Sequence, residues 1–550
     1  MSKKIKYIVF ALLTVILFNT IGSYFYKRFD LTSDKRFTLA KITRTLLDKV
    51  DAPLTVKVYL EGNFPAEFKR LQIETRQFLE ELRAKNANII IRFINPDNIR
   101  KKLIDKGMMP SKLTVEEDGN VSEAIIFPWA EVYYKNKTET VSLLPTGIEK
   151  SQEEQLQKAI ENLEYSFTNA INNLTQKNQK KIAVLVGNGE LQDIYLYSFL
   201  KEISKKYHLA KFTLDSVKKN PKKTLQELTN FNLAIIANPT QRFSDEEKET
   251  LDQFIINGGK TLWMLDNTQA DQDSLFTDGK MLAYSRDLNL TDFFFSYGIR
   301  INHTLIKDLY AAKISLATGN IGNQTQFKQL PWLYHPLANT NPNHAITKNV
   351  PRVRLQFANN IDTLKNNIKK TPLLVSSALT HKIGTPKIIT LQSMTTTPKQ
   401  EYFNNGVQLF GVLLEGKFTS MYKNRTKPFD LKSFKETSPK NKMIIIADGD
   451  VAKNQILKGK PYDLSFDKWT NEEFGNKAFL LNAVDYLLDD SGIIGLRNKT
   501  IPIKILDKQK VYTQRTFWQF FNIIFPLICL ALFGFGFNYW RKKKYCKKSN

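Results

Sequence analysis

Acidic and amide side chains follow several predicted strands at the points where those strands end. Because the carboxyl ends of parallel strands meet at one edge of a sheet, we expect these side chains to gather where doubly wound folds bind ligands. Carboxylate and amide oxygens at such an edge can bind a cation or act as general acid and base. The candidate ligand edge consists of Asn188, Glu190, Asn238, Asp266, Asp448 and Asp450.

The same residue types also suit turns and helix caps at strand ends, and we adopt this interpretation. A hard cation needs six or more oxygens, and no dense acidic loop accompanies Asp448 and Asp450. General acid catalysis would need a carboxyl held in an apolar pocket, which no pattern in the sequence indicates. We therefore predict no catalytic residue, no metal and no cofactor, and keep a membrane-tethered hydrolase that uses this edge as the alternative.

Other catalytic chemistry is largely excluded by residue usage. The two cysteines, Cys529 and Cys546, lie in the last apolar segment and the basic tail, so the intervening domain has no disulfide and no thiolate nucleophile. The five histidines are dispersed and are interpreted as core or surface residues. Phe254 stands where a P-loop ending in Gly259 would need glycine, and the GxSxG and HExxH motifs are absent.

The elements that would position the edge are short apolar runs. Strands are predicted at 182–186, 233–237, 261–265 and 443–447, each a continuous apolar run typical of a strand buried on both faces. Ser244 and Glu247 have the spacing of a capping box that begins a helix ending at 258–259. Alternation of these strands with helices, the last at 476–488, predicts a mainly parallel, doubly wound sheet.

An earlier α/β unit precedes this sheet. Strands at 54–60 and 88–94 flank an amphipathic helix, which is the opening of a thioredoxin-like fold. Residues 62–65, Gly-Asn-Phe-Pro, stand where a redox thioredoxin carries its cysteine pair, so that chemistry is absent. Thr38 is predicted to cap a helix, and a long helix is predicted over 151–176.

Two apolar segments, 7–25 and 517–540, are long enough to cross a bilayer. Lysines at 3, 4 and 6 and the basic run 541–544 flank them, so both termini are predicted to be cytoplasmic and the large domain external. A cleavable signal peptide is the rival interpretation of the first segment, but residues 19–26 offer no small-x-small site.

The predicted fold class is therefore α/β, in a membrane protein with two terminal transmembrane helices, a thioredoxin-like domain, and a doubly wound domain that carries a β-rich insertion. The predicted boundaries are 1–6 for the cytoplasmic N-terminus, 7–25 for the first span, 27–150 for the thioredoxin-like domain, 151–330 for the long helix and doubly wound domain, 331–440 for the insertion, 441–500 for the return to the doubly wound domain, 517–540 for the second span and 541–550 for the basic tail.

The net charge of +26 would suggest nucleic acid in a cytosolic protein. Two membrane anchors make nucleic acid an unsuitable partner. An external basic domain can instead lie against anionic headgroups or an anionic envelope polymer, and a lysine-rich solvated surface is the simpler explanation. We keep the polymer binder as a further alternative function.

Several motifs together resemble one family. They are RFDLTSDKRFTL at 28–39, VKVYLEGNFPAEFKRL at 56–71, VGNGE at 186–190, LLEGKFTSMYKNR at 413–425, IADGD at 446–450 and FLLNAVDYLLDD at 479–490. Their order and number resemble the gliding-motility ABC-transporter auxiliary protein family, GldG, over almost the whole chain.

This resemblance implies a non-enzymatic accessory subunit in the inner membrane, with a periplasmic domain, that works with a separate permease and a separate ATPase. It also implies a glutamine-amidotransferase-like fold for the second domain. The family pattern Gly-His-Gly-Glu corresponds to residues 187–190, where this chain has Asn188 in place of histidine. Histidine-based catalysis at this loop is therefore not expected.

Overall fold

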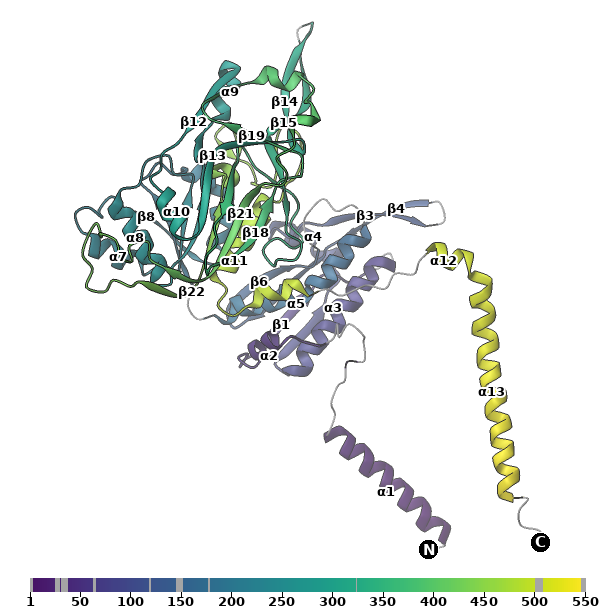
Figure 1. Cartoon of the computed structure of the whole chain (residues 1–550). Helices are drawn as coiled ribbons and strands as arrows, with labels where there is room; N and C mark the ends of the chain where they lie inside the picture. The colour runs from purple at the N-terminus through teal and green to yellow at the C-terminus, as the bar shows by residue number, and fades with distance from the viewer. Residues whose placement is uncertain are drawn as a thin grey trace. The chain divides into compact units, whose positions relative to one another are not determined.

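Apolar runs form strands and amphipathic stretches form helices in a mixed α/β structure (Figure 1). The computed structural model describes residues 3–24, 30, 38–62, 66–117, 120–144, 152–176, 179–322, 324–499 and 508–545. The chain divides into two compact units, Met1–Thr500 and Ile501–Asn550, and each is described by itself.

The first α/β layer is built on a four-stranded sheet in the order β2-β1-β5-β6. Strand β1 runs parallel to β2 and antiparallel to β5, and alternate residues of β1 are buried. Its elements are α2 (Lys41–Leu47), β1 (Leu54–Val58), α3 (Ala66–Lys85), β2 (Ile89–Phe93), η1 (Asp97–Ile99), α4 (Arg100–Asp105), β3 (Ser111–Glu117), β4 (Asn120–Ile126), β5 (Trp129–Tyr134) and β6 (Lys137–Ser142). Of the predicted cysteine-replacing turn, Gly62 is described and Asn63–Pro65 lie outside the described residues.

The long predicted helix is confirmed as α5 (Gln152–Thr175). Its apolar stripe is buried, and the rings of Phe167 on α5 and Phe78 on α3 lie 5.8 Å apart between centroids. The buried stripe consists of Leu156, Ile160, Leu163, Phe167, Ile171 and Leu174. Helix α5 is therefore held against the first layer by close-packed apolar contacts.

The main sheet has the strand order β14-β15-β18-β21-β22-β10-β9-β7-β8. The ranges are β14 (Ala311–Ile321), β15 (Gln324–Thr340), β18 (Lys369–Val375), β21 (Leu409–Thr419), β22 (Thr437–Ile446), β10 (Lys260–Met264), β9 (Leu233–Ala237), β7 (Lys181–Val186) and β8 (His208–Thr213). All pairs from β22 to β8 are parallel, and all pairs from β14 to β22 are antiparallel. The sheet is thus mixed, whereas the sequence predicted a mainly parallel one.

Helices cover both faces of the parallel half. Ile182 and Val184 of β7 pack into one core with α6 (Asp193–Ser204) and α11 (Asn476–Leu488). Ala183 and Leu185 pack into the other core with α7 (Pro221–Leu228) and α8 (Asp245–Ile256). Because β7, β9, β10 and β22 are buried on both faces, their sequences contain continuous apolar runs. The predicted capping box of Ser244 and Glu247 is confirmed at the start of α8.

Smaller elements surround the antiparallel half. Two three-stranded sheets have the orders β11-β12-β20 and β17-β13-β19. Strands β15, β18 and β21, from the region predicted as a β-rich insertion, extend the main sheet. The ranges are β11 (Thr268–Gln269), α9 (Gln272–Asp278), β12 (Lys280–Ser285), α10 (Thr291–Ser296), β13 (Ile299–Asp308), β16 (Val353–Arg354), β17 (Asn359–Thr363), β19 (Thr380–Gly384), β20 (Lys387–Thr390), η2 (Leu391–Thr395), η3 (Gln400–Tyr402), η4 (Gly449–Ala452), β23 (Ile456–Leu457), β24 (Lys460–Pro461) and η5 (Ile493–Asn498).

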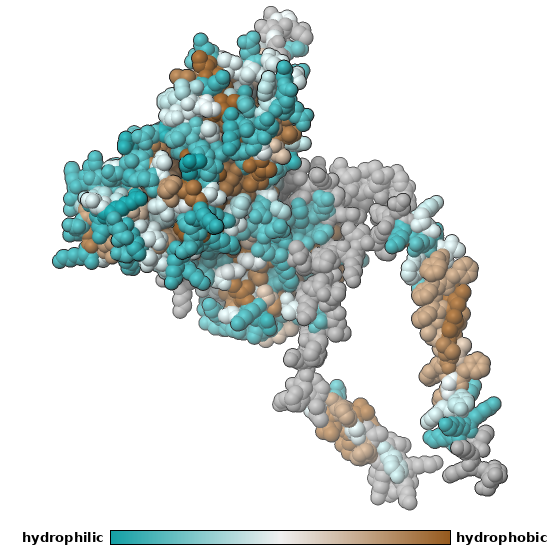
Figure 2. All heavy atoms as spheres, viewed as in Figure 1, coloured by the Kyte–Doolittle hydropathy of each residue, from teal (hydrophilic) through white to brown (hydrophobic). Residues whose placement is uncertain are grey.

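Both predicted membrane segments are helical, as α1 (Lys3–Tyr24) and, after α12 (Lys508–Thr513), α13 (Arg515–Tyr545). Among the described residues, α13 alone is long and apolar enough to cross a membrane, with a mean hydropathy of 2.2. Figure 2 shows its apolar band followed by hydrophilic residues, which include Lys542–Lys544. Membrane crossing by α1 stays a prediction.

Candidate functional site

The turn after β22 holds the first part of the predicted edge. Asp448 is fully buried and begins η4, where its carboxylate accepts the N–H of Asp450 at 2.8 Å. Its second oxygen accepts the N–H of Gln356 at 2.6 Å. Because both hydrogen bonds come from backbone amides, this carboxyl fixes the path of two chain segments.

Asp266 and Asn238 bring the ends of β10 and β9 to the same turn. Asp266 accepts the N–H of Gly449 at 2.8 Å, and Asn238 donates to Asp450 at 3.0 Å. A Cβ at Gly449 would lie 2.3 Å from Cγ of Asn238, so the close approach of these segments requires glycine there. The structure thus brings Asn238, Asp266, Asp448 and Asp450 into one cluster, which we call the carboxylate cluster.

The carboxylate cluster also contains two basic residues, which were not among the predicted edge residues. Arg286, which follows β12, donates to Oδ1 of Asn238 at 2.9 Å and to the carbonyl of Pro239 at 3.3 Å. Lys453 lies 3.6 Å from Asp450 between Nζ and Oδ2. The spacing of Asp450 and Lys453 on one turn was a usable signal, but Arg286 comes from a different sheet and no local pattern indicates it.

Burial and mutual repulsion keep this cluster from carrying its full negative charge. Burial, followed by the charge of Asp450, raises the pKa of Asp266 from 3.8 to about 7. Burial, followed by the charges of Asp266 and Asp450, raises the pKa of Asp448 well above its ordinary value. The buried carboxyls of Asp266 and Asp448 therefore hold their protons to a higher pH than an exposed carboxyl does.

A pKa near 7 suits a general acid, but the geometry favours a structural role. Asp448 is 0% exposed and Asp266 is 7% exposed, and both bind backbone amides of their own fold. Within the described part of the chain, no group of three or more His, Cys, Asp or Glu residues could hold a metal ion. The arrangement ties together the ends of β9, β10 and β22, while the absence of catalysis stays a prediction.

Asn188 and Glu190 form a separate group in the loop after β7. The Asn188 N–H donates to Glu190 at 2.8 Å, and the Asn188 amide donates to Glu247 at 3.3 Å. The other oxygen of Glu190 is buried without a hydrogen-bond partner among the described residues. Burial, followed by the charge of Glu247, raises the pKa of Glu190. The predicted edge thus divides into two groups, because Glu247 at the start of α8 engages the β7 loop.

Comparisons with known proteins cover most of this chain. Residues 33–133 match a domain of unknown function, DUF7088. An uncharacterized protein of Borreliella burgdorferi is 21% identical over 505 residues, covering 90% of this chain and 89% of that protein. The solved mmIFT52 N-terminal domain is 12% identical with a TM-score of 0.32, covering 56% of this chain and 99% of that domain, and this likeness is too weak to establish a shared fold.

The remaining match covers the main sheet and its helices. Residues 179–483, more than half of the chain, match the family model described as an ABC-type uncharacterized transport system. This range contains every residue of the predicted ligand edge. The chain therefore belongs to this family of ABC-type transport systems, whose auxiliary character points to a non-enzymatic accessory role.

Proposed function

We propose that this chain is a membrane-anchored, non-enzymatic accessory subunit of an ABC transport system associated with gliding motility. The family match over 179–483 carries the proposal, and the motifs that resemble the gliding-motility auxiliary proteins support its finer part. Its partners are a permease and a separate ATPase. The large domain assists assembly of the transporter or engages its substrate.

The proposed location is the inner membrane, with α1 and α13 as anchors, both termini in the cytoplasm and the large domain in the periplasm. Basic residues 541–544 at the end of α13 and lysines at 3, 4 and 6 support this orientation. Because the cysteines lie at 529 and 546, a single cysteine introduced at exposed Asn230 gives a clean label. We expect Asn230→Cys to react with an impermeant thiol reagent once the outer envelope is permeable. Labelling that requires disruption of the inner membrane would contradict the orientation.

We also propose a thioredoxin-like fold for the first layer and a glutamine-amidotransferase-like fold for the second domain. The β2-β1-β5-β6 order with an antiparallel β5–β6 hairpin supports the first assignment. In the second, the parallel strands in chain order β7, β8, β9, β10 and β22 lie in the spatial order 2-1-3-4-5, the order of flavodoxin-like doubly wound sheets. The hydrolase alternative has less support, because Asp266 and Asp448 accept hydrogen bonds from backbone N–H groups of the same fold.

A complementation experiment tests the proposed function. In a strain that lacks the gene, we expect the full chain to restore gliding or transport, whereas a chain that ends after residue 507 should not, because it lacks α13. A chain in which α13 is replaced by an unrelated single-span helix is the matched control, which separates anchoring from specific helix contacts. Full activity of the chain without α13 would contradict the proposed anchoring.

A further inference from the structure

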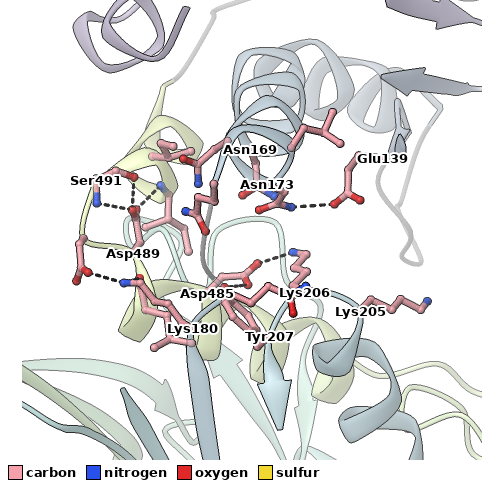
Figure 3. Close-up of a pocket in the computed structure, with 18 of the residues that line it drawn as sticks. Glu139, Asn169, Asn173, Lys180, Lys205, Lys206, Tyr207, Asp485, Asp489 and Ser491 are labelled. Atoms are coloured by element: carbon pink, nitrogen blue, oxygen red, sulfur yellow. Dashed lines mark hydrogen bonds and ion pairs between the residues drawn. The ribbon is translucent and has the colours of Figure 1, made fainter. Parts of the chain in front are cut away.

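A cavity of about 560 Å³ lies within the Met1–Thr500 unit, where α5 meets the ends of α6 and α11 (Figure 3). Its lining includes Gln179 and Lys180, which directly precede β7, whereas the predicted ligand edge follows the carboxyl end of that strand. Its volume falls in the range of small-molecule sites, about 300–1,000 Å³. The cavity is therefore a site distinct from the carboxylate cluster.

One wall of the cavity is a polar stripe of α5. Tyr165, Asn169, Asn172, Asn173 and Gln176 recur at helical spacing and all line the cavity. Figure 3 shows Asn169 and Asn173 extending from α5 toward the residues of the opposite wall. Here the polar stripe of α5 lines a concave cavity that is partly open to solvent.

Most of this stripe has unused hydrogen-bonding capacity. Asn173 donates to Glu139 at 2.8 Å. Four other polar groups of the stripe make no hydrogen bond to a described residue. They are the side-chain amides of Asn169, Asn172 and Gln176 and the hydroxyl of Tyr165. Three amides and one hydroxyl are thus available to a bound molecule.

Each of the four acidic residues of the lining accepts a hydrogen bond, Glu139 from Asn173 and Asp490 from Lys180. Asp485 accepts hydrogen bonds from Lys206 at 3.0 Å and from the Tyr207 hydroxyl at 2.9 Å. Asp489 accepts backbone N–H groups that include those of Ser491 and Ile494. Burial alone lowers the pKa of Lys206, but the Asp485 charge reverses this effect and raises it, so this ion pair stays charged.

Two lysines of the lining have no carboxylate partner among the described residues. Lys49 and Lys137 line the cavity from the first α/β layer, and neither forms an ion pair with a residue that the structure describes. Toward the described residues, the ammonium of Lys137 donates one hydrogen bond, to the carbonyl oxygen of Gln176 at 3.4 Å. The cavity therefore presents two solvent-exposed lysines that form no ion pair with a described residue, beside side-chain amide donors, and this donor set suits an oxyanion.

We propose that this cavity binds a small molecule that carries a carboxylate or phosphate group, with Lys49 and Lys137 facing the anion and Asn169 and Asn172 holding the remaining polar groups. This site goes beyond the proposed transport role and does not depend on it, because binding is measured on the purified chain alone.

Isothermal titration of the full chain in detergent tests the proposal with three probes: inorganic phosphate, glycerol 3-phosphate and acetate. Sodium chloride keeps the ionic strength constant, since free charges respond to salt. We expect saturable binding of at least one probe to one site per chain. Tighter binding of glycerol 3-phosphate identifies a headgroup-like ligand, whereas tighter binding of phosphate or acetate identifies a free anion. No saturable binding of any of the three would overturn the proposal.

Paired variants locate the site. Lys49→Gln with Lys137→Gln should weaken binding at least tenfold, whereas Lys218→Gln with Lys219→Gln should leave it unchanged, since these exposed lysines lie outside the cavity and the pair removes the same charge. Asn169→Ala with Asn172→Ala keeps the net charge and should weaken binding severalfold. Equal weakening by both lysine pairs, or no effect of the asparagine pair, would show general charge attraction and overturn the assignment.

Discussion

Asp266 provides a sharp test of the structure because its carboxyl is nearly buried and has a raised pKa. The substitution Asp266→Asn removes the titrating group and keeps an oxygen that can accept the Gly449 N–H. A shift in pKa from 3.8 to about 7 corresponds to roughly 4 kcal/mol between protonation states, at 1.36 kcal/mol per unit. The ionised form of Asp266 is therefore the form that destabilises the fold.

The sign of the effect follows from proton binding. Since the pKa of Asp266 is higher in the folded state, the folded chain holds more protons than the unfolded chain between about pH 4 and pH 7. The contribution of Asp266 to stability is complete below about pH 4 and is lost as the pH rises through 7. The Asp266→Asn variant has no group that ionises at this position. Its free energy of unfolding, relative to that of the wild type, should therefore increase by roughly 2–4 kcal/mol between pH 4 and pH 8.

Urea unfolding of the detergent-solubilised chain, followed by tryptophan fluorescence at four pH values, measures this difference. Asp278→Asn is the matched control, because Asp278 is exposed at the end of α9 and its variant should follow the pH profile of the wild type. A pH profile of Asp266→Asn that is parallel to that of the wild type would refute the raised pKa of Asp266.

Two further sets of substitutions test the structural roles of Asp448 with Asp450 and of Glu164. Asp448→Asn with Asp450→Asn should destabilise the fold by about 1–3 kcal/mol, because an amide NH2 replaces an acceptor of backbone N–H groups. This double variant should leave transport intact when the protein is present in a normal amount. If transport is lost although the protein is abundant and the complex is assembled, the hydrolase alternative would be supported instead. Glu164→Ala should cost about 2–4 kcal/mol, since buried Glu164 accepts from the Ala40 N–H and from Thr43 and Lys499. In thermal denaturation, the exposed Glu227→Ala should change stability by less than about 0.5 kcal/mol, and an equal effect of both would contradict the assigned role of Glu164.

Glu164 also illustrates the limit of local sequence reasoning. Thr38 was predicted to cap the first helix, but its hydroxyl donates to Asp30, and α2 begins after Ala40 without a side-chain cap of its own. The Ala40 N–H is satisfied by Glu164, which lies on α5 and far along the chain. A tertiary contact thus replaced the local cap, and no local pattern could indicate it.

Four strands of the parallel half, β7, β9, β10 and β22, were predictable because burial on both faces leaves a continuous apolar run in each. The edge strand β8 was missed because its residues are exposed or half-buried and polar residues interrupt its apolar ones. The antiparallel half was not predictable, since β15 and β18 carry mixed burial and their pairing depends on contacts distant in sequence. Four residues of the predicted edge lie together in the carboxylate cluster because they follow three adjacent parallel strands, while ligand binding at this edge stays a prediction. Arg286 and the cavity beside α5 were missed, because both arise where separate layers meet.

Co-purification shows whether this chain is bound to a transporter in the membrane. The full chain should be extracted from membranes in a mild detergent and isolated by an affinity tag, and the proteins that accompany it should be identified by mass spectrometry. We expect a multi-span permease and a separate nucleotide-binding ATPase in amounts comparable to the tagged chain, and their loss when α13 is replaced by an unrelated span. Isolation of abundant, folded chain without either transporter component would contradict the account.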